Sequence, residues 1–422
     1  MIQLDGLSHQ RLRDGIDRGL LPTLERWLRD GTHHLHTLDS GLPSQTSSAQ
    51  ATLLYGVSDP PPGFRWYDRL AGRARSSRSP ADLQHIARAW LEKAGLLVGG
   101  AAITSAWPAG ADHRALVLSE GLRVSNLQAV PWGAAFPPHW PQGARGANPA
   151  AMLRGILVAG VLDALTTAAT VAAVATLRGP IFATLLGYDQ VAHHAGLDAP
   201  MADWALRRLD EALRAIETAN SRQTNRARIV VFADHGLSEC VSIRKLRRET
   251  LGGMIVRVTG TSRRDWHVAP SGNLAHVYAL SKAASSALGR LAGILARDEA
   301  IGFVVHAGIA LGRNGEVDLV AGTVAGDHPL AVYGSTGLRT RQVAKLARHP
   351  DAGDLIVMGA VDGDGSVVAF EDQSAAHGGM GGAQTEAFVL LPVNFSANEA
   401  LSLLSLRELL LRRLSPVHIS HL

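Results

Sequence analysis

The chain has 422 residues, of which 18% are charged and 46% are hydrophobic. This composition is typical of globular proteins, and the length allows one large domain or two to three smaller ones. The formal charge of +4 comes mostly from Arg side chains interspersed with acids, so no nucleic-acid-binding surface is evident. A single cysteine, Cys240, excludes an intrachain disulfide and a thiolate-rich metal site. Any metal must therefore be held by His and carboxylate side chains.

The N-terminal sequence MIQLDGLSHQ has neither the basic region nor the apolar stretch of a signal peptide. For the chain as given, we therefore expect a cytoplasmic location. One internal run, ILVAGVLDALTTAATVAAVATL (156–177), is long enough to span a membrane. Asp163 near its middle, and its content of Ala, Val and Thr, favour a buried or half-buried helix instead.

Apolar segments alternate with helical patterns along the chain. MIQLDGLS, PIFATLLGYD and ARIVVFADHG predict buried strands, and DLIVMGAVDG and EAFVLLPV predict further ones. LPTLERWLRDG predicts a helix that begins at its Pro and ends near Gly31, and MADWALRRLDEALRAIETAN predicts a second helix. SANEALSLLSLRELLLRRL predicts a closing helix. This alternation is typical of an α/β fold with a mainly parallel sheet covered by helices on both faces.

Residues from about 240 to 350 follow a different pattern. GMIVRVTG, AHVYALS and IGFVVHAGIAL predict short strands around one helix, AASSALGRLAGILAR. We therefore predict a smaller α+β insertion or cap subdomain at 241–349. The main α/β domain is then made of residues 1–240 and 350–422.

Three of the predicted strands end in an acidic residue, namely Asp5, Asp189 and Asp234. In open α/β sheets, ligands gather at the carboxyl ends of the strands. Asp189 is followed by His193 four residues later, and Asp234 is followed directly by His235. His194 is adjacent to His193 and is expected to point away from it. A further candidate ligand lies in the glycine-dense segment AAHGGMGG, at His377.

Together, the six candidate ligands form two sets of three nitrogen and oxygen donors. That number suits two zinc-like ions, each with an open position for substrate. Two such ions can stabilise both the attacking and the leaving oxygen of a phosphoryl transfer. The residues alone leave the nucleophile open among four hydroxyls in SGLPSQTSSAQ, namely Ser44, Thr46, Ser47 and Ser48.

The order of these motifs is an early Asp, a hydroxyl-rich loop, D-x-x-x-H, D-H-G and a late H-G-G. It resembles the alkaline phosphatase superfamily and, within it, the type I phosphodiesterase/nucleotide pyrophosphatase branch. The chain is also similar to bacterial members with motifs of the form PSQT, FRWYD, GYD-x-x-AHH-x-G and HGG-x-GG-x-Q. The resemblance extends from Asp5 to Pro392, and it is strong because several weak motifs occur in the right order.

The resemblance implies a metal-dependent hydrolase of small-molecule phosphate esters, with diesters favoured, that acts through a phospho-threonine intermediate. It implies two divalent ions, expected to be zinc, although manganese or iron could occupy such a site. It places the nucleophile at Thr46. One ion would be held by Asp189, His193 and His377, and the other by Asp5, Thr46, Asp234 and His235.

Two departures from the family pattern affect these expectations. Nucleotide pyrophosphatases place an Asn three residues after the nucleophile, where this chain has Ala49 followed by Gln50. Gln50 and Arg65 are candidate substrate-binding residues, although the segment around Arg65 could equally be a structural strand.

Asp5 follows a very short first strand, and relatives commonly carry more chain upstream, sometimes membrane-spanning. A membrane association through missing upstream chain is therefore a second expectation.

Two alternatives to the phosphodiesterase remain. One is a phosphomonoesterase or another ester hydrolase of the same superfamily. The other is a catalytically inactive, membrane-associated scaffold derived from such an enzyme.

Overall fold

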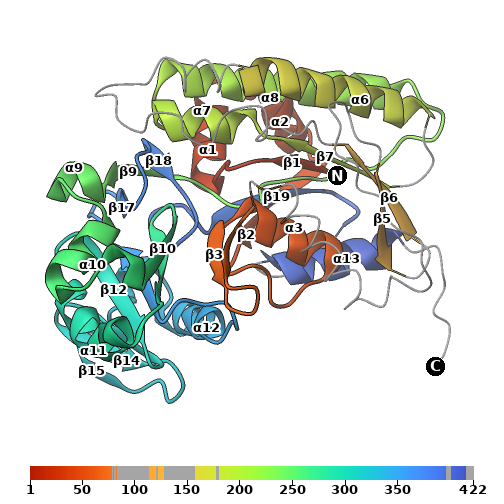
Figure 1. Ribbon diagram of the computed structural model, residues 1–422. Helices are drawn as coiled ribbons and strands as arrows, with labels where there is room; N and C mark the ends of the chain where they lie inside the picture. The colour runs from red at the N-terminus through yellow and green to blue at the C-terminus, as the bar shows by residue number, and fades with distance from the viewer. Residues whose placement is uncertain are drawn as a thin grey trace.

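The computed structural model describes residues 1–77, 79, 82, 114–119, 122–127, 157–176, 180–395 and 401–414. These residues form a mixed α/β fold with one sheet of eight strands, one of seven and two small sheets. In Figure 1 the eight-stranded sheet and its helices take up the upper and right-hand parts of the molecule. The seven-stranded sheet lies at the lower left. The predicted α/β class is confirmed.

The first large sheet has the strand order β20-β2-β19-β8-β1-β7-β6-β5. Its central strands β8, β1, β7 and β6 are parallel, as are β2 and β20. In contrast, β19 is antiparallel to both of its neighbours, and β5 is antiparallel to β6. The strands are β1 (Ile2–Leu4), β2 (His33–Asp39), β5 (Arg114–Ser119), β6 (Leu122–Leu127), β7 (Ile181–Leu185), β8 (Val231–Phe232), β19 (Glu386–Pro392) and β20 (Leu401–Ser402).

In Figure 1, α2, α6, α7 and α8 lie above this sheet, and α3 and α13 lie below it. The helices around the sheet are α1 (His9–Asp17), α2 (Pro22–Arg29), α3 (Thr46–Tyr55), α6 (Asp163–Thr176), α7 (Gly187–Ala195), α8 (Pro200–Ser221) and α13 (Leu403–Leu414). α8 buries one face at helical spacing, through Leu206, Leu209, Leu213 and Ile216. Each such side chain contributes about 1.5–3 kcal/mol through burial.

The predicted helix at 22–31 is confirmed with its expected ends. α2 begins at Pro22, whose missing N–H costs nothing in the first turn of a helix. Gly31 follows the last turn with φ of 64°, a left-handed conformation in which glycine carries no Cβ penalty. Trp27 on this helix is buried in the main core.

The second large sheet is antiparallel throughout, in the order β10-β11-β16-β12-β13-β14-β15. Its strands are β10 (Trp266–Ser271), β11 (Leu274–Ala279), β12 (Ile301–His306), β13 (Ile309–Leu311), β14 (Gly315–Asp318), β15 (Val324–Gly326) and β16 (Leu355–Gly359). Side chains of α10 (Leu251–Thr259) and α11 (Lys282–Leu295) form one apolar core with it, and α12 (Thr336–Ala347) shares another. β16 therefore joins this sheet, although it lies outside the predicted 241–349 insertion.

The remaining described elements are short. A three-stranded sheet has the order β17-β9-β18, from β17 (Val367–Ala369), β9 (Ser238–Ser242) and β18 (Ala375–Ala376). β3 (Arg65–Asp68) pairs with β4 (Arg73–Ser76) as an antiparallel hairpin. Short helical segments are η1 (Val158–Leu162), α9 (Ile243–Arg247), η2 (Arg263–Asp265) and η3 (Ala331–Tyr333).

The prediction of a strand in GMIVRVTG is wrong, because this segment forms α10. The side chain of Thr250 caps the helix by accepting from the Gly253 N–H, and Gly260 ends it with φ of 71°. Leu251, Met254 and Ile255 form its buried face. Local capping and burial outweigh the strand preference of the β-branched residues.

The apolar run at 156–177 contains η1 and α6. The segment Ala159–Thr176 is long and apolar enough to cross a membrane, judged by length and composition alone. Of this segment, 28% is buried within the protein, whereas core helices that meet the same criterion are mostly buried. The expected membrane association is not supported by this observation alone.

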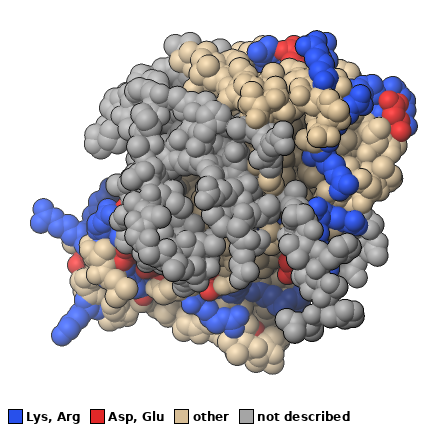
Figure 2. All heavy atoms as spheres, turned by 90° about the vertical axis from the view of Figure 1, so that its right-hand side faces the viewer, with Lys and Arg blue, Asp and Glu red and all other residues tan. Residues whose placement is uncertain are grey.

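The described part of the face in Figure 2 shows Lys and Arg at several separate places, some beside acidic side chains.

Candidate active site

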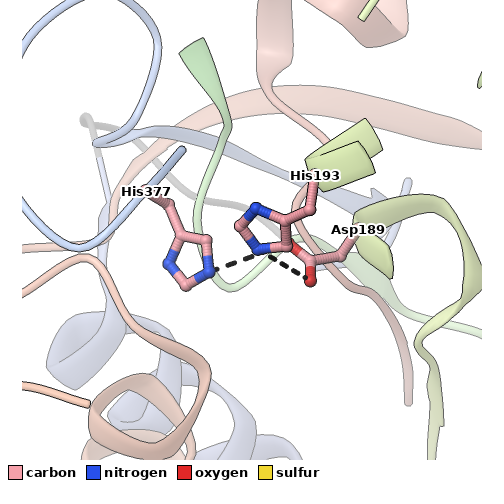
Figure 3. A group of neighbouring side chains, drawn as sticks. All are labelled: Asp189, His193 and His377. Atoms are coloured by element: carbon pink, nitrogen blue, oxygen red, sulfur yellow. Dashed lines mark ion pairs between the residues drawn. The ribbon is translucent and has the colours of Figure 1, made fainter. Parts of the chain in front are cut away.

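The first predicted ligand set lies together in the structure (Figure 3). α7 places Asp189 in its first turn and His193 one turn later, so both project from the same helix face. His377 comes from the segment after β18. One ligand atom from each of the three residues lies within 4.8 Å of the others. The Asp189 Oδ2 to His193 Nε2 distance is 3.3 Å, and Asp189 Oδ1 lies 3.8 Å from His377 Nε2.

The second predicted set consists of Asp5, Asp234 and His235, all of which are buried. Asp5 follows β1, and Asp234 and His235 follow the adjacent parallel strand β8, so neighbouring carboxyl ends bring them together. Their ligand atoms also lie within 4.8 Å of one another. The short first strand that precedes Asp5 lies in the interior of the sheet, between β7 and β8.

The two sets adjoin each other. The rings of His235 and His377 are stacked, with centroids 3.9 Å apart and planes 16° apart. Gly6 follows Asp5 with φ of 71°, and a Cβ at this position would lie 2.7 Å from Asp189 Oδ1. Glycine is required here both for the left-handed backbone and for the close approach of the Asp5 loop to Asp189.

The three histidines share one mode of orientation. In each, Nδ1 lies within hydrogen-bond distance of a backbone carbonyl, which can only accept, so Nδ1 carries the proton. In the neutral ring, Nε2 is then free of hydrogen and faces the carboxylates, as a metal ligand requires. The bonds join His193 to Ala375 (2.7 Å), His377 to Ser44 (2.8 Å) and His235 to Gly236 (3.1 Å).

The buried carboxylates show an electrostatic need for a cation. Burial, followed by repulsion from Asp234 and Asp189, holds the pKa of Asp5 well above its usual range. Burial also raises the pKa of Asp234 to about 6. For Asp189, burial acts in the same direction, but its interactions with the nearby histidines, above all His193, bring its pKa below the usual range.

Two carboxylate oxygens of the site have unmet hydrogen-bonding capacity. Within the described chain, Asp189 Oδ1 and Asp234 Oδ2 are buried and have no hydrogen-bond partner. Such orphaned acceptors are rare and call for a ligand or ion. Carboxylate and imidazole donors suit zinc, and the residues of both sets therefore fit divalent ions.

Thr46 is the hydroxyl that lies at the second set. Its Oγ1 donates to Asp5 Oδ1 at 3.1 Å and lies 3.1 Å from His235 Nε2. It is the first residue of α3, and the side chain of the preceding residue forms no cap. The first N–H groups of a helix lack intrahelical acceptors and favour an anion.

The other three candidate hydroxyls are bonded elsewhere. Ser44 donates to the Gly379 carbonyl, Ser48 donates to the Pro61 carbonyl, and Ser47 accepts from Ser77. None of these three bonds is made to a candidate metal ligand. Among the four hydroxyls that the sequence left open, Thr46 is therefore the one whose bonds are made to the second ligand set.

Gln50 and Arg65 lie outside both ligand sets. The Gln50 amide, one turn after Thr46, donates to Gln3 Oε1 at 3.0 Å in the buried part of the sheet. The Arg65 guanidinium donates to Glu371 Oε1 at 2.6 Å and to the Pro270 carbonyl at 3.0 Å. The neighbouring Trp66 is buried. Both candidates thus have structural partners, and their contact with substrate stays a prediction.

Ser44 has a positioning role that the sequence did not indicate. Its carbonyl orients His377, and its hydroxyl accepts from the Gly378 N–H at 3.0 Å and donates to the Gly379 carbonyl at 2.8 Å. The segment that leads into Thr46 is therefore fastened to the loop that carries His377. A serine two residues before a candidate nucleophile carries no sequence signal for such a role.

Residues 1–301 match the profile of the family described as type I phosphodiesterase / nucleotide pyrophosphatase. The chain belongs to this family. It is accordingly a phosphoester hydrolase of the alkaline phosphatase superfamily. The matched region contains five of the six predicted non-hydroxyl ligands together with Thr46, and it ends before His377.

Solved structures similar to this chain include phosphonoacetate hydrolase from Sinorhizobium meliloti 1021, in complexes with phosphonoformate and with phosphonoacetate. The sequence identities are 16% and 14%, and both comparisons have a TM-score of 0.48. Each covers 97% of this chain and 94% of the other. No curated protein matches the sequence.

Proposed function

We propose that this hydrolase is a phosphodiesterase that works through a phospho-threonine intermediate on Thr46, beside two divalent metal ions. The observation that carries the proposal is the position of the Thr46 hydroxyl, 3.1 Å from both Asp5 Oδ1 and His235 Nε2. The adjoining set of Asp189, His193 and His377 supports a second ion. Family membership supports the substrate class, a small-molecule phosphate ester.

Each of the two proposed ions has its own set of candidate ligands. Asp189, His193 and His377 would hold one, and Asp5, Asp234 and His235, together with Thr46, would hold the other. Zinc is the expected metal from this donor chemistry. Such ions supply stabilisation of the charge on the attacking and leaving oxygens and lower the pKa of a bound hydroxyl or water.

The reaction has two displacements at phosphorus. In the first, the Thr46 oxygen attacks phosphorus, the bond to the leaving oxygen breaks, and the released alcohol carries a proton in exchange for the one that Thr46 loses. In the second, water attacks the phospho-threonine, the bond to the Thr46 oxygen breaks, a proton from water restores the Thr46 hydroxyl, and a phosphomonoester is released. Because each step inverts the phosphorus centre, the overall reaction retains configuration. The N-terminus of α3 favours the anionic group throughout.

The second large sheet contacts the candidate active site, and we propose that it forms a cap over it. Gly272, in the turn between β10 and β11, packs directly on the His377 backbone, with no room for a Cβ. Glu371 Oε2 accepts from the Gly272 N–H at 2.9 Å while Oε1 pairs with Arg65. We therefore propose that residues 241–349 form a cap subdomain together with β16, which lies between β11 and β12 in the same sheet. The rest of 1–240 and 350–422 is then the catalytic domain.

Metal content and turnover test the proposal. Purified protein is expected to contain two zinc ions per chain and to hydrolyse bis-p-nitrophenyl phosphate faster than p-nitrophenyl phosphate. Thr46→Ala should remove turnover, by roughly a thousandfold or more, because the nucleophile is lost. Ser47→Ala is the matched control, since its hydroxyl bonds Ser77, and it should keep activity.

Other outcomes would assign other functions. Faster turnover of the monoester would indicate a phosphomonoesterase. Failure to bind metal, or turnover that Thr46→Ala does not change, would overturn the mechanism. Mass spectrometry of acid-quenched enzyme should find phosphate on the peptide that contains Thr46, and its absence under single-turnover conditions would argue against the covalent intermediate.

A further inference from the structure

Asp163 is the single charged residue in the apolar helical segment from Val158 to Thr176. A charge in such a segment is costly unless it is paired or hydrogen-bonded. Its side chain is nevertheless buried, with 6% of the residue exposed. The reason for its burial lies outside its own helix.

Both carboxylate oxygens of Asp163 bind the start of α7. The Leu186 N–H donates to Oδ1 and the Gly187 N–H donates to Oδ2, each at 2.9 Å. Leu186 occupies the N-cap position of α7 and provides no capping side chain. Asp163 thus caps α7 from a different helix, satisfying two of the N–H groups that a helix start leaves free.

The packing around this cap leaves little freedom. A Cβ on Gly187 would overlap both the Asp163 carboxylate and the backbone of Ala159 in η1. Only glycine permits this approach, so η1 and the first residue of α7 are held in direct contact. The position of α7 along its axis is consequently fixed by Asp163 and by this contact.

α7 is the helix that presents Asp189 and His193. Asp189 lies two residues after Gly187, and His193 lies one turn further on the same face. The far end of this face is held by the bond between His193 Nδ1 and the Ala375 carbonyl. The cap by Asp163 is the corresponding restraint at the near end. Residues that orient metal ligands in this way can change metal affinity by roughly 10–100-fold.

We infer that Asp163 is a positioning residue for the first metal site, which it preorganises by capping and anchoring α7. This inference rests on the proposed two-metal function. The apolar helical segment that contains Asp163 would thus help to build the metal site, which neither its composition nor its hydropathy suggests. It also explains why an acid interrupts the apolar run.

The chain contains a matched control for this role. Asp210, on α8 and also buried, caps α2 from outside that helix. Its Oδ1 accepts from the Thr23 N–H at 2.9 Å and the Leu24 N–H at 3.4 Å. The N-cap position of α2 is again a leucine without a capping bond, at Leu21. α2 carries none of the predicted ligands, so its cap should matter for stability alone.

Zinc affinity of the full-length protein tests the inference. Metal-free wild type, Asp163→Asn and Asp210→Asn are titrated with zinc against a chromophoric chelator, and thermal unfolding is recorded for each. The zinc step that belongs to the first site is identified by its loss in His377→Ala. Asp163→Asn should weaken that step roughly ten- to hundredfold and leave the other step unchanged. Asp210→Asn should lower the melting temperature about as much as Asp163→Asn does, without changing the zinc affinity of either site.

The results separate this inference from the proposed function. Wild type that binds no zinc would overturn both. Wild type that binds two ions, with unchanged affinities in Asp163→Asn, would overturn the positioning role alone. An equal loss of affinity in Asp210→Asn would also overturn it, because the effect would then be one of general stability. If Asp163→Asn does not fold, Asp163→Ser, which keeps one acceptor oxygen, takes its place with the same expected result.

Discussion

His276 makes the stability of the protein depend on pH in a predictable direction. It lies in β11 and is fully buried. Its Nε2 lies 2.9 Å from the Pro62 carbonyl and must carry the proton, while Nδ1 accepts from the Gly353 N–H at 3.0 Å. This pairing accommodates the neutral ring only, because a second proton on Nδ1 would oppose the Gly353 N–H.

The size of the effect follows from the pKa. Burial, aided by the positive charge of His349, lowers the pKa of His276 from 6.5 to about 4, although the Pro62 bond opposes the shift. Between these two values, the unfolded chain binds a proton that the folded protein does not. The free energy of unfolding therefore rises with pH by about 1.4 kcal/mol per pH unit. Stability on the order of 3 kcal/mol is present above about pH 6.5 and is lost as the pH falls to about 4.

Urea unfolding of wild type and His276→Gln at several pH values measures this contribution. Glutamine does not titrate, and the other titrating groups cancel in the difference between the two proteins. Between about pH 7 and 4.5, we expect the stability advantage of wild type to shrink by about 2–3 kcal/mol. A difference that stays constant across this range, whatever its value, would refute the reasoning.

Two further predictions concern the site. EDTA should lower the melting temperature, and zinc should restore it, because Asp5 and Asp234 otherwise stay buried without a counter-charge. At a free zinc concentration of about a thousand times Kd, each ion contributes about 4 kcal/mol to the free energy of unfolding. An unchanged melting temperature would contradict the metal assignment. Gly187→Ala should destabilise the protein by about 2–5 kcal/mol through overpacking against Ala159 and loss of the Asp163 cap. Its control is Gly293→Ala in α11, where the added methyl meets no described atom within 4 Å apart from the local backbone of its own helix. A comparable loss in both variants would refute the packing argument.

Much of the candidate site could be predicted because its signals are local. The pairing of Asp189 with His193 is visible in their spacing of four residues, although Asp189 lies in the first turn of α7 and not at the end of the predicted strand. Asp5 and Asp234 follow apolar segments that become adjacent parallel strands. The start of α2 at Pro22 is equally local, because a proline fits the first turn of a helix and no later one.

The features that could not be predicted depend on tertiary contacts. The choice of Thr46 among four hydroxyls depends on which one faces Asp5 and His235, and sequence spacing does not encode that direction. α10 was missed because Ile255, Val256 and Val258 favour strands, whereas its cap at Thr250 and its buried face favour a helix. The partner of Asp163 lies 23 residues away, beyond the reach of any local pattern.

The two ligand sets differ in how much of the chain must fold to build them. Asp5, Asp234 and His235 come from adjacent strands of one sheet. The first set also needs His377, whose backbone packs on Gly272 in the turn between β10 and β11. The ring of His377 is held by the Ser44 carbonyl, two residues before Thr46. We therefore expect the proposed zinc binding at the first set to require both sheets and the segment before Thr46 in their native arrangement. A variant in which only the second sheet unfolds should therefore lose zinc binding at the first set and keep it at the second.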